Sequence, residues 1–401
     1  MMEEKLKKFI LDHREDDVRQ LALQASRYPD IDMPFALTQI AGWQSIHDKV
    51  PTWAACPDIM YPSHLPLEQC SSEATAIYKC GVVAKLGLTD SLVDLTGGFG
   101  IDCWFMSHAF QHTTYIERQV ELVKIAEHNF NVLDDNCQLS IVNCQSEEWL
   151  NTHSPVSWLY IDPARRDNHG GKTIAISDCD PNVCELEENL VKKADKVMVK
   201  LSPMLDLSQA CNQLKHIQEI HIVSVDNECK ELLLILSADC NTDAETLPIH
   251  CVNIRKDEKQ EFTFSKQEEK LSPCQMAQNI AQYLYEPNAS ILKAGAYRCL
   301  TQRFGIQKLH TNSHLYTSNQ AIADFPGRMF EVEGFCGFGK KELKALLANV
   351  QQANLTIRNF PASVADLRKR LHLQEGGDTY LFATTLNPQQ KILIQCKKRR
   401  S

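Results

Sequence analysis

The stretch 92–102 constrains the fold of this chain more than any other. It reads Leu-Val-Asp-Leu-Thr-Gly-Gly-Phe-Gly-Ile-Asp, so an apolar strand pattern ends in an acid and then meets three glycines within four positions. Glycine allows a sharp turn and leaves the backbone uncovered, and the helical pattern that follows points its positive end at that backbone. A strand, a glycine turn and a helix in this order predict a binding site for a polar ligand.

Strand and helix patterns alternate after residue 90, which predicts a parallel sheet with helices on both faces. The last two strand patterns are separated only by a short polar turn around 226–227, so they are predicted to form an antiparallel hairpin. The predicted strands are 91–95, 112–117, 138–143, 156–161, 196–201, 217–225 and 230–237.

With 401 residues the chain is too long for a single core. Ser71, Thr75 and Lys79 precede the first strand, either in a helix that only packs or at the border of a ligand pocket. Residues 275–284 are predicted to be helical. The predicted regions are a helical N-terminal region (1–85), an α/β core (86–240), a linker hairpin with a further small segment (241–322) and an α+β domain (323–396).

Composition excludes several classes of protein. The first residues are too charged for a signal peptide, and no run of 18 apolar residues occurs, so a cytoplasmic protein without a membrane partner is predicted. No two of the 16 cysteines lie three positions apart. Scattered thiols of this kind are typical of reduced core residues, and no metal site is predicted. The sequence leaves the oligomeric state open.

Charge is distributed unevenly along the chain. The net charge is −9, but residues 323–401 hold 13 Lys and Arg against 7 Asp and Glu, which leaves −15 on the first 322 residues. A basic domain on an acidic chain predicts contact with nucleic-acid phosphates, and ordinary solvated faces are the alternative. The candidate substrate-binding residues of this domain are Lys340, Lys341, Arg368 and Arg370.

Glu117 ends the second predicted strand, 20 positions after Gly97, where a carboxylate can accept hydrogen bonds from ribose hydroxyls. This arrangement occurs in dinucleotide-binding domains and in S-adenosylmethionine enzymes. Two details favour the methyl donor. The first is the glycine turn, in which Cys103 stands where the dinucleotide fingerprint has its third glycine and Asp94 would repel a pyrophosphate but could face a donor amine. The second is the predicted antiparallel hairpin at the end of the sheet, which resembles the inserted last strand of class I S-adenosylmethionine-dependent methyltransferases. Gln145, after the third strand, can accept a hydrogen bond from adenine.

The fourth predicted strand ends in Asp162-Pro163-Ala-Arg165, at the edge where open α/β sheets bind ligands. A rigid proline turn beside an acceptor can hold a base amine in line for methyl transfer. Arg165 or Arg166 could stack on a base or bind a phosphate. Leu201 stands where 5-methyluridine enzymes have their attacking cysteine, which favours methylation of nitrogen over carbon.

Four stretches, 68–79, 94–102, 160–166 and 199–203, together resemble class I S-adenosylmethionine-dependent methyltransferases of the Bacteroidetes type. The resemblance covers nearly the whole chain. It implies a Rossmann-like sheet of seven strands with the last antiparallel, a ferredoxin-like segment, a THUMP-like C-terminal domain, and S-adenosyl-L-methionine as cofactor. The donor-site residues that follow are Asp94, Thr96, Gly97, Gly98, Gly100, Ile101, Asp102, Glu117, Arg118, Gln145 and Ser146.

The expected reaction is methylation of a base nitrogen in structured RNA, either tRNA or rRNA. Asp162, Pro163 and Arg165 are the catalytic candidates, and Arg166 and Lys200 are expected to bind the substrate. The alternative is a methyltransferase of a protein or a small molecule, with the C-terminal domain used for docking or dimerisation. The intact glycine turn argues against a third class, a binding module without catalysis.

Overall fold

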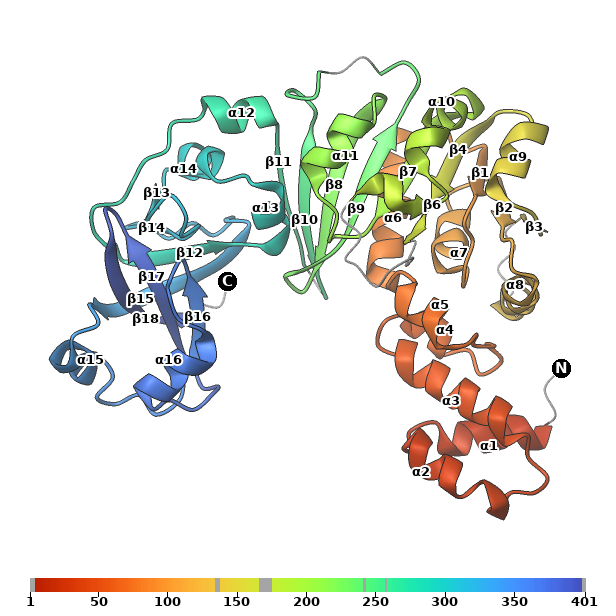
Figure 1. Cartoon of the computed structure of the whole chain (residues 1–401), viewed down its shortest axis with the longest axis horizontal. Helices are drawn as coiled ribbons and strands as arrows, with labels where there is room; N and C mark the ends of the chain where they lie inside the picture. The colour runs from red at the N-terminus through yellow and green to blue at the C-terminus, as the bar shows by residue number, and fades with distance from the viewer. Residues whose placement is uncertain (1–3, 134–137, 166–174, 241–242, 257, 399–401) are drawn as a thin grey trace. The chain divides into compact units, whose positions relative to one another are not determined.

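A computed structural model describes residues 4–133, 138–165, 175–240, 243–256 and 258–398, without the side chains of His64, Leu65 and Arg165 (Figure 1). The chain divides into two compact units, 1–218 with 233–241, and 219–232 with 242–401. Among the described helices, none combines the length and the apolar character that crossing a membrane requires.

Helices fill the described part of the chain before the first strand. Asp17, Asp32 and Ser72 each cap a helix by accepting a hydrogen bond from a backbone N–H in its first turn. Trp53 is fully buried and packs edge-on against Phe99 and Trp104 beside the glycine turn. The helices are α1 (Glu4–His13), α2 (Val18–Leu23), α3 (Met33–Ile46), α4 (Pro51–Ala54), α5 (His64–Gln69) and α6 (Glu73–Leu86), with a 3₁₀ turn at Ala25–Arg27.

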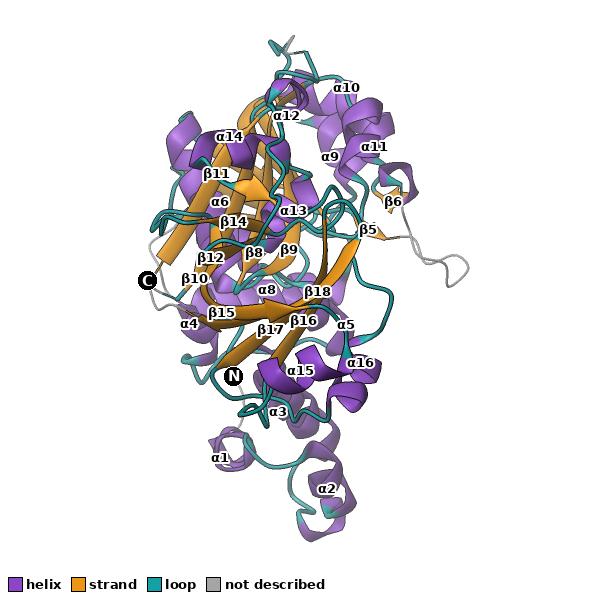
Figure 2. Cartoon of the chain, turned by 90° about the vertical axis from the view of Figure 1, so that its left-hand side faces the viewer, coloured by secondary structure: helices purple, strands orange, loops and turns teal. Residues whose placement is uncertain are grey.

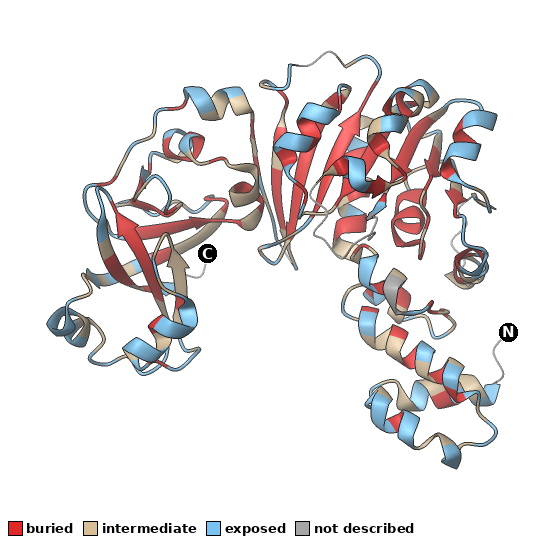
Figure 3. Cartoon of the chain, in the orientation of Figure 1, coloured by how far each residue is buried: buried red, intermediate tan, exposed pale blue. Residues whose placement is uncertain are grey.

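The seven predicted strands are all present, each within two residues of its predicted ends. The first five of these strands pair in parallel, and the strand Val156–Ile161 is buried along almost its whole length, as a central parallel strand should be (Figure 3). The intervening helices are α7 (Ile101–Ser107), α8 (Val120–Leu133), α9 (Ser146–Thr152), α10 (Val183–Lys193) and α11 (Leu207–Gln213), with a 3₁₀ turn at Ile176–Asp178.

The large sheet has nine strands rather than the seven predicted, in the order β11-β10-β8-β9-β7-β4-β1-β2-β3. The hairpin placed in a linker is part of this sheet, because β10 pairs in parallel with β8 and continues its ladder of backbone hydrogen bonds. The strands are β1 (Ser91–Asp94), β2 (His112–Ile116), β3 (Leu139–Val142), β4 (Val156–Ile161), β7 (Ala194–Leu201), β8 (Ile217–Val225), β9 (Glu228–Leu236), β10 (Ile249–Arg255) and β11 (Glu258–Phe264). A separate small ribbon pairs β5 (Ala164–Arg165) with β6 (Cys179–Asp180).

A second sheet of seven strands follows, in the order β13-β14-β12-β15-β18-β17-β16 (Figure 2). One face packs Leu381 and Leu393 against Leu367 of α16, and the other packs Phe330 and Phe382 into a separate core. The elements are α12 (Lys266–Leu271), β12 (Tyr283–Pro287), α13 (Ala289–Ala294), α14 (Arg298–Phe304), β13 (Gln307–Lys308), β14 (Tyr316–Ser318), β15 (Gly327–Cys336), α15 (Lys340–Leu346), β16 (Asn354–Arg358), α16 (Val364–Leu371), β17 (Thr379–Leu386) and β18 (Gln390–Lys398).

One prediction about this part of the chain was wrong. Residues 275–284 are not helical, because Gln275 and Ala277 exchange backbone hydrogen bonds with Lys308 and hold the segment extended. The alternating residues 390–398 form β18 between β15 and β17, so this strand extends past residue 396.

Candidate active site

The glycine turn follows β1 and is packed tightly against β2. A side chain at Gly97 would bring its Cβ within 2.2 Å of the Tyr115 ring, so only glycine fits there. Gly98 and Gly100 have φ values of 54° and 93°, in the left-handed region that favours glycine. Among the described residues, a Cβ at Gly98 would have one neighbour within 4 Å, the Thr96 carbonyl oxygen at 3.7 Å. The turn is therefore fixed from one side and open at Gly98.

Glu117, at the end of β2, is buried and held in one orientation. Its Oε2 accepts a hydrogen bond from the Gly98 N–H at 3.0 Å, and its Oε1 accepts one from the Gln119 N–H at 2.8 Å. The Tyr115 hydroxyl also donates to the Gly98 carbonyl, at 2.6 Å. Because each carboxylate oxygen has two lone pairs, both oxygens of Glu117 keep capacity for a ligand.

Asp94 ends β1 and is 1% exposed. One carboxyl oxygen accepts a hydrogen bond from the Thr96 N–H at 2.9 Å. Burial raises the pKa of this carboxyl well above its usual range, against the lowering effect of that hydrogen bond, and the nearby Asp102 and Asp162 raise it further. A cationic group brought close to Asp94 would favour its ionised form.

Asp162 follows β4 directly and is held at two points. Its N–H donates to Thr96 Oγ1 at 2.6 Å, and its Oδ2 accepts a hydrogen bond from Lys200 Nζ at 2.5 Å. Parallel register explains the second contact, because Ile161 of β4 pairs with Val199 of β7 and the next residues are Asp162 and Lys200. The Asp162 side chain is 34% exposed, so its carboxylate remains accessible beside a buried lysine.

Lys200 also connects Asp162 to a buried ionic network around Asp102. Asp102, in the first turn of α7, is paired with Lys79 Nζ at 3.0 Å, and Lys200 Nζ lies 4.0 Å away. The hydroxyls of Ser71 and Tyr160 each donate to Asp102 Oδ2 at 2.6 Å. Burial raises the pKa of Asp102, but the two ammonium groups and the two hydroxyls outweigh it and lower this pKa to about 2. Asp102 is therefore ionised and anchors Lys200.

Other predicted donor-site residues have structural partners. Ser146 donates to the Leu95 carbonyl at 2.7 Å, and Ile101 lies in the core that contains Trp53. Arg118 forms an ion pair with Asp180 of β6 at 3.0 Å. The structure thus places most of the predicted donor residues after the carboxyl ends of β1, β2 and β3.

Gln145 is exposed immediately before α9, and Pro163 is buried in the turn after Asp162. The side chain of Arg165 and all of Arg166 lie outside the described residues.

The predicted basic residues of the C-terminal domain differ in their surroundings. Lys340 and Lys341 are exposed at the start of α15, where the Glu342 carboxylate already accepts from the Gly339 N–H. Arg370 is exposed and lies over the Phe338 ring at 5.6 Å. Arg368 Nη1 instead donates to the carbonyls of Ala353 and Gln374, so this residue stabilises the domain.

Sequence reasoning did not assign Lys79, Ser71 and Tyr160 to the site. By sequence Lys79 is a possible border of a pocket, but its side chain is fully buried against Asp102. A lysine within the apolar residues of α6 was the available signal, since lysines are almost never fully buried unless paired.

Comparisons with known proteins identify the family. Two family models match the C-terminal part, a ferredoxin-like domain over 283–326 and a THUMP domain-like model over 327–398. A protein of Porphyromonas gingivalis W83, whose crystal structure is assigned to a methyltransferase, is 33% identical; the match covers 100% of each chain with a TM-score of 0.88. This chain belongs to the same methyltransferase family. The predicted family, the enzyme class and the donor S-adenosyl-L-methionine are thereby confirmed.

Two other solved structures are far less similar to this chain. TrmK of M. capricolum, in complex with S-adenosyl-homocysteine, is 11% identical over 41% of this chain and 70% of that chain, with a TM-score of 0.32. An O-methyltransferase from Bacillus cereus, in complex with the same molecule, is 10% identical over 48% of this chain and 99% of that chain, with a TM-score of 0.34. Likeness at this level carries no argument about function. No curated protein matches the chain.

The residues at the glycine turn fit the methyl donor. The opening at Gly98 leaves room for a ligand beside the backbone, and Glu117 has acceptor capacity directed at the same turn. Asp94 supplies a buried carboxyl that a cationic amine would stabilise in its ionised form.

Proposed function

We propose that this methyltransferase modifies a base nitrogen of structured RNA, either tRNA or rRNA. The observation that carries the proposal is the Asp162 carboxylate, which Lys200 fixes at 2.5 Å while a third of the side chain stays exposed. A carboxylate held in this way accepts a hydrogen bond from a base amine and orients the nitrogen lone pair. Methyl transfer depends on such in-line positioning more than on acid–base catalysis.

The donor would lie along the glycine turn. When bound, S-adenosyl-L-methionine supplies a methyl group on a positively charged sulfur. Glu117 would accept hydrogen bonds from the ribose hydroxyls, and Asp94 would face the amine of the donor. The position of β9 between β7 and β8 supports the class I arrangement with its inserted last strand.

The chain's own residues account for the transfer step. Pro163 keeps the turn after Asp162 rigid, and Lys200 keeps the Asp162 carboxylate at the edge of the sheet. The nitrogen would lose a proton on methylation, and this proton would pass to Asp162 or to water. Leu201 is buried and cannot act as a nucleophile, which supports direct transfer to nitrogen.

The C-terminal domain supports RNA as the substrate. Its sequence matches a THUMP domain-like model and carries the excess of positive charge, and Lys340, Lys341 and Arg370 are exposed on it. These three residues would bind phosphates, and Arg165 and Arg166 are proposed to contact a base or a phosphate. Lys200, which the sequence predicts as a substrate contact, would instead position Asp162, because the Lys200 side chain is only 11% exposed.

The test is methylation of total RNA from a strain that lacks the gene, using labelled donor. Wild-type enzyme is expected to label RNA at a base nitrogen, and Asp162→Asn, which disturbs the positioning of the base, to lower the rate by about 100-fold with unchanged donor affinity. Glu148→Gln, which changes an exposed carboxylate on α9, is the matched control and should retain full activity. Label found only in protein or small molecules would refute the proposal.

A further inference from the structure

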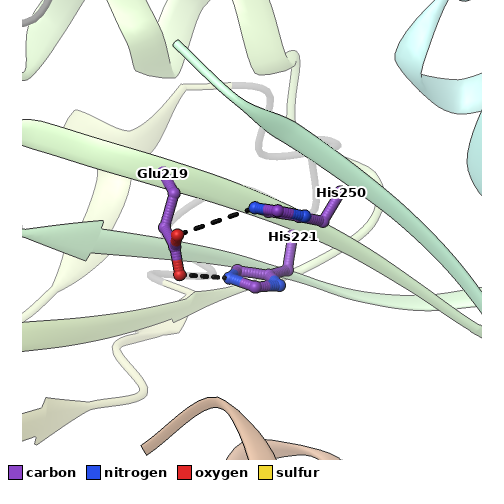
Figure 4. A group of neighbouring side chains, drawn as sticks. All are labelled: Glu219, His221 and His250. Carbon is purple, nitrogen blue, oxygen red and sulfur yellow. Dashed lines mark hydrogen bonds and ion pairs between the residues drawn. The ribbon is translucent and has the colours of Figure 1, made fainter. Parts of the chain in front are cut away.

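Two strands of the large sheet bring together an acid and two histidines that the methyl-transfer site does not use. Glu219 and His221 lie on β8, and His250 lies on β10 (Figure 4). His221 and His250 are register partners in the parallel pair, and Glu219 precedes His221 by two residues. Since alternate strand residues share a face, all three side chains lie on the same side of the sheet.

The potential ligand atoms of these residues are close together. His221 Nε2 lies 3.0 Å from Glu219 Oε1, and His250 Nε2 lies 3.6 Å from Glu219 Oε2. One ligand atom from each residue lies within 4.8 Å of the other two. The imidazole rings are stacked with their centroids 4.6 Å apart, so both Nε2 atoms face the same carboxylate.

The outer nitrogen of His250 has a partner of its own. His250 Nδ1 lies 2.8 Å from Thr263 Oγ1 on β11, its register partner in the antiparallel pair. When Nδ1 carries the proton and donates it to Thr263, Nε2 keeps its lone pair and faces the carboxylate. His250 Nε2 is buried and has no hydrogen-bond partner among the described residues. Two lone pairs that face each other in a buried place need a cation between them, either a proton or a metal ion.

We propose that Glu219, His221 and His250 bind a divalent first-row transition-metal ion such as Zn²⁺. One ligand atom of each residue converges on the same small volume, as the atoms around a single metal ion must. Two imidazoles and one carboxylate are a known ligand set for zinc and for non-haem iron, in which three protein ligands leave a position for solvent. Thr263 would act as the outer partner of His250, accepting a hydrogen bond from Nδ1–H while Nε2 binds the ion. This site is independent of the proposed methyl transfer to RNA.

The test uses the full chain, stripped of metal with a chelator and titrated with Co²⁺ and then Zn²⁺. We expect one equivalent of Co²⁺ to bind with absorption typical of nitrogen and oxygen ligands, and Zn²⁺ to displace it. Because the chain has many cysteines, a thiolate charge-transfer band would assign the metal to them and overturn the proposal. Failure to bind either ion would also overturn it.

Variants locate the ion. Glu219→Gln and His250→Gln are expected to weaken binding by at least about 100-fold, and Thr263→Val by about 10- to 100-fold. His372→Asn, which removes an exposed histidine from the end of α16, is the matched control and should bind as wild type does. Binding that is equal in all four variants would overturn the proposal. If the Gln variants fail to fold, two other measurements test the proposal. Thr263→Val should bind the ion more weakly, and the histidine ring protons of wild type should shift when the ion is added.

Discussion

Charged side chains are buried at the carboxyl ends of the parallel strands, here called the donor edge, and exposed on the C-terminal domain, here called the basic surface. At the donor edge Asp102, Lys79 and Lys200 are buried and each is held by other side chains. On the C-terminal domain Lys340, Lys341 and Arg370 are exposed. Reacting groups must be held at fixed positions, whereas contact with a phosphate backbone needs only accessible positive charge. Substitutions in the first region should therefore have much larger effects.

The largest effect is expected from Lys79→Met. The variant leaves Asp102 without its nearest ammonium group in a buried place, which should lower the free energy of unfolding by about 3–5 kcal/mol. Thermal and urea unfolding of the two proteins measure the change. Lys5→Met removes an exposed ion pair with Asp30 and should have no measurable effect. Equal stability of the Lys79→Met variant and wild type would contradict the importance of the network.

A smaller effect, with a characteristic pH dependence, is expected from Asp94→Asn. Because the pKa of Asp94 is raised in the folded state, its protonated form stabilises the fold at low pH. That contribution is lost as pH rises from the unfolded pKa through the folded one. The stability of wild type relative to Asp94→Asn should thus fall with rising pH, by at most about 1.4 kcal/mol per pH unit. Melting curves of the two proteins between pH 5 and 8 measure this difference. If Asp94 were not buried and protonated, the stabilities of wild type and Asp94→Asn would change in parallel with pH.

The smallest effect is expected on the basic surface. A double variant, Lys340→Gln with Lys341→Gln, should weaken tRNA binding only several-fold and reduce the salt slope of the affinity by about 1–2. Affinity measured over a range of salt concentrations tests this. Lys85→Gln, at an exposed position on α6, is the control. An unchanged slope in the double variant would remove these lysines from the RNA surface.

The same contrast explains what the sequence could predict. Asp94, Glu117 and Asp162 each follow a recognisable strand, and the carboxyl ends of parallel strands meet at one edge, so their convergence was predictable. Lys79 was not, because its partner depends on how α6 packs against α7. The sequence predicts β10–β11 as a linker hairpin and not as part of the large sheet, since its polar edge strand lacks an apolar pattern. Glu219 and His221 alternate visibly on one strand, but the register that adds His250 is set only in three dimensions.

The most direct measurement of the donor site is calorimetry with S-adenosyl-L-methionine. Wild type is expected to bind the donor and not NAD, and Glu117→Gln to bind it about 10- to 100-fold more weakly, because one acceptor of the ribose hydroxyls is lost. Glu121→Gln, exposed at the start of α8, should bind as wild type does. Binding of NAD in place of the methyl donor, or equal affinity in wild type and Glu117→Gln, would contradict a donor site at the glycine turn.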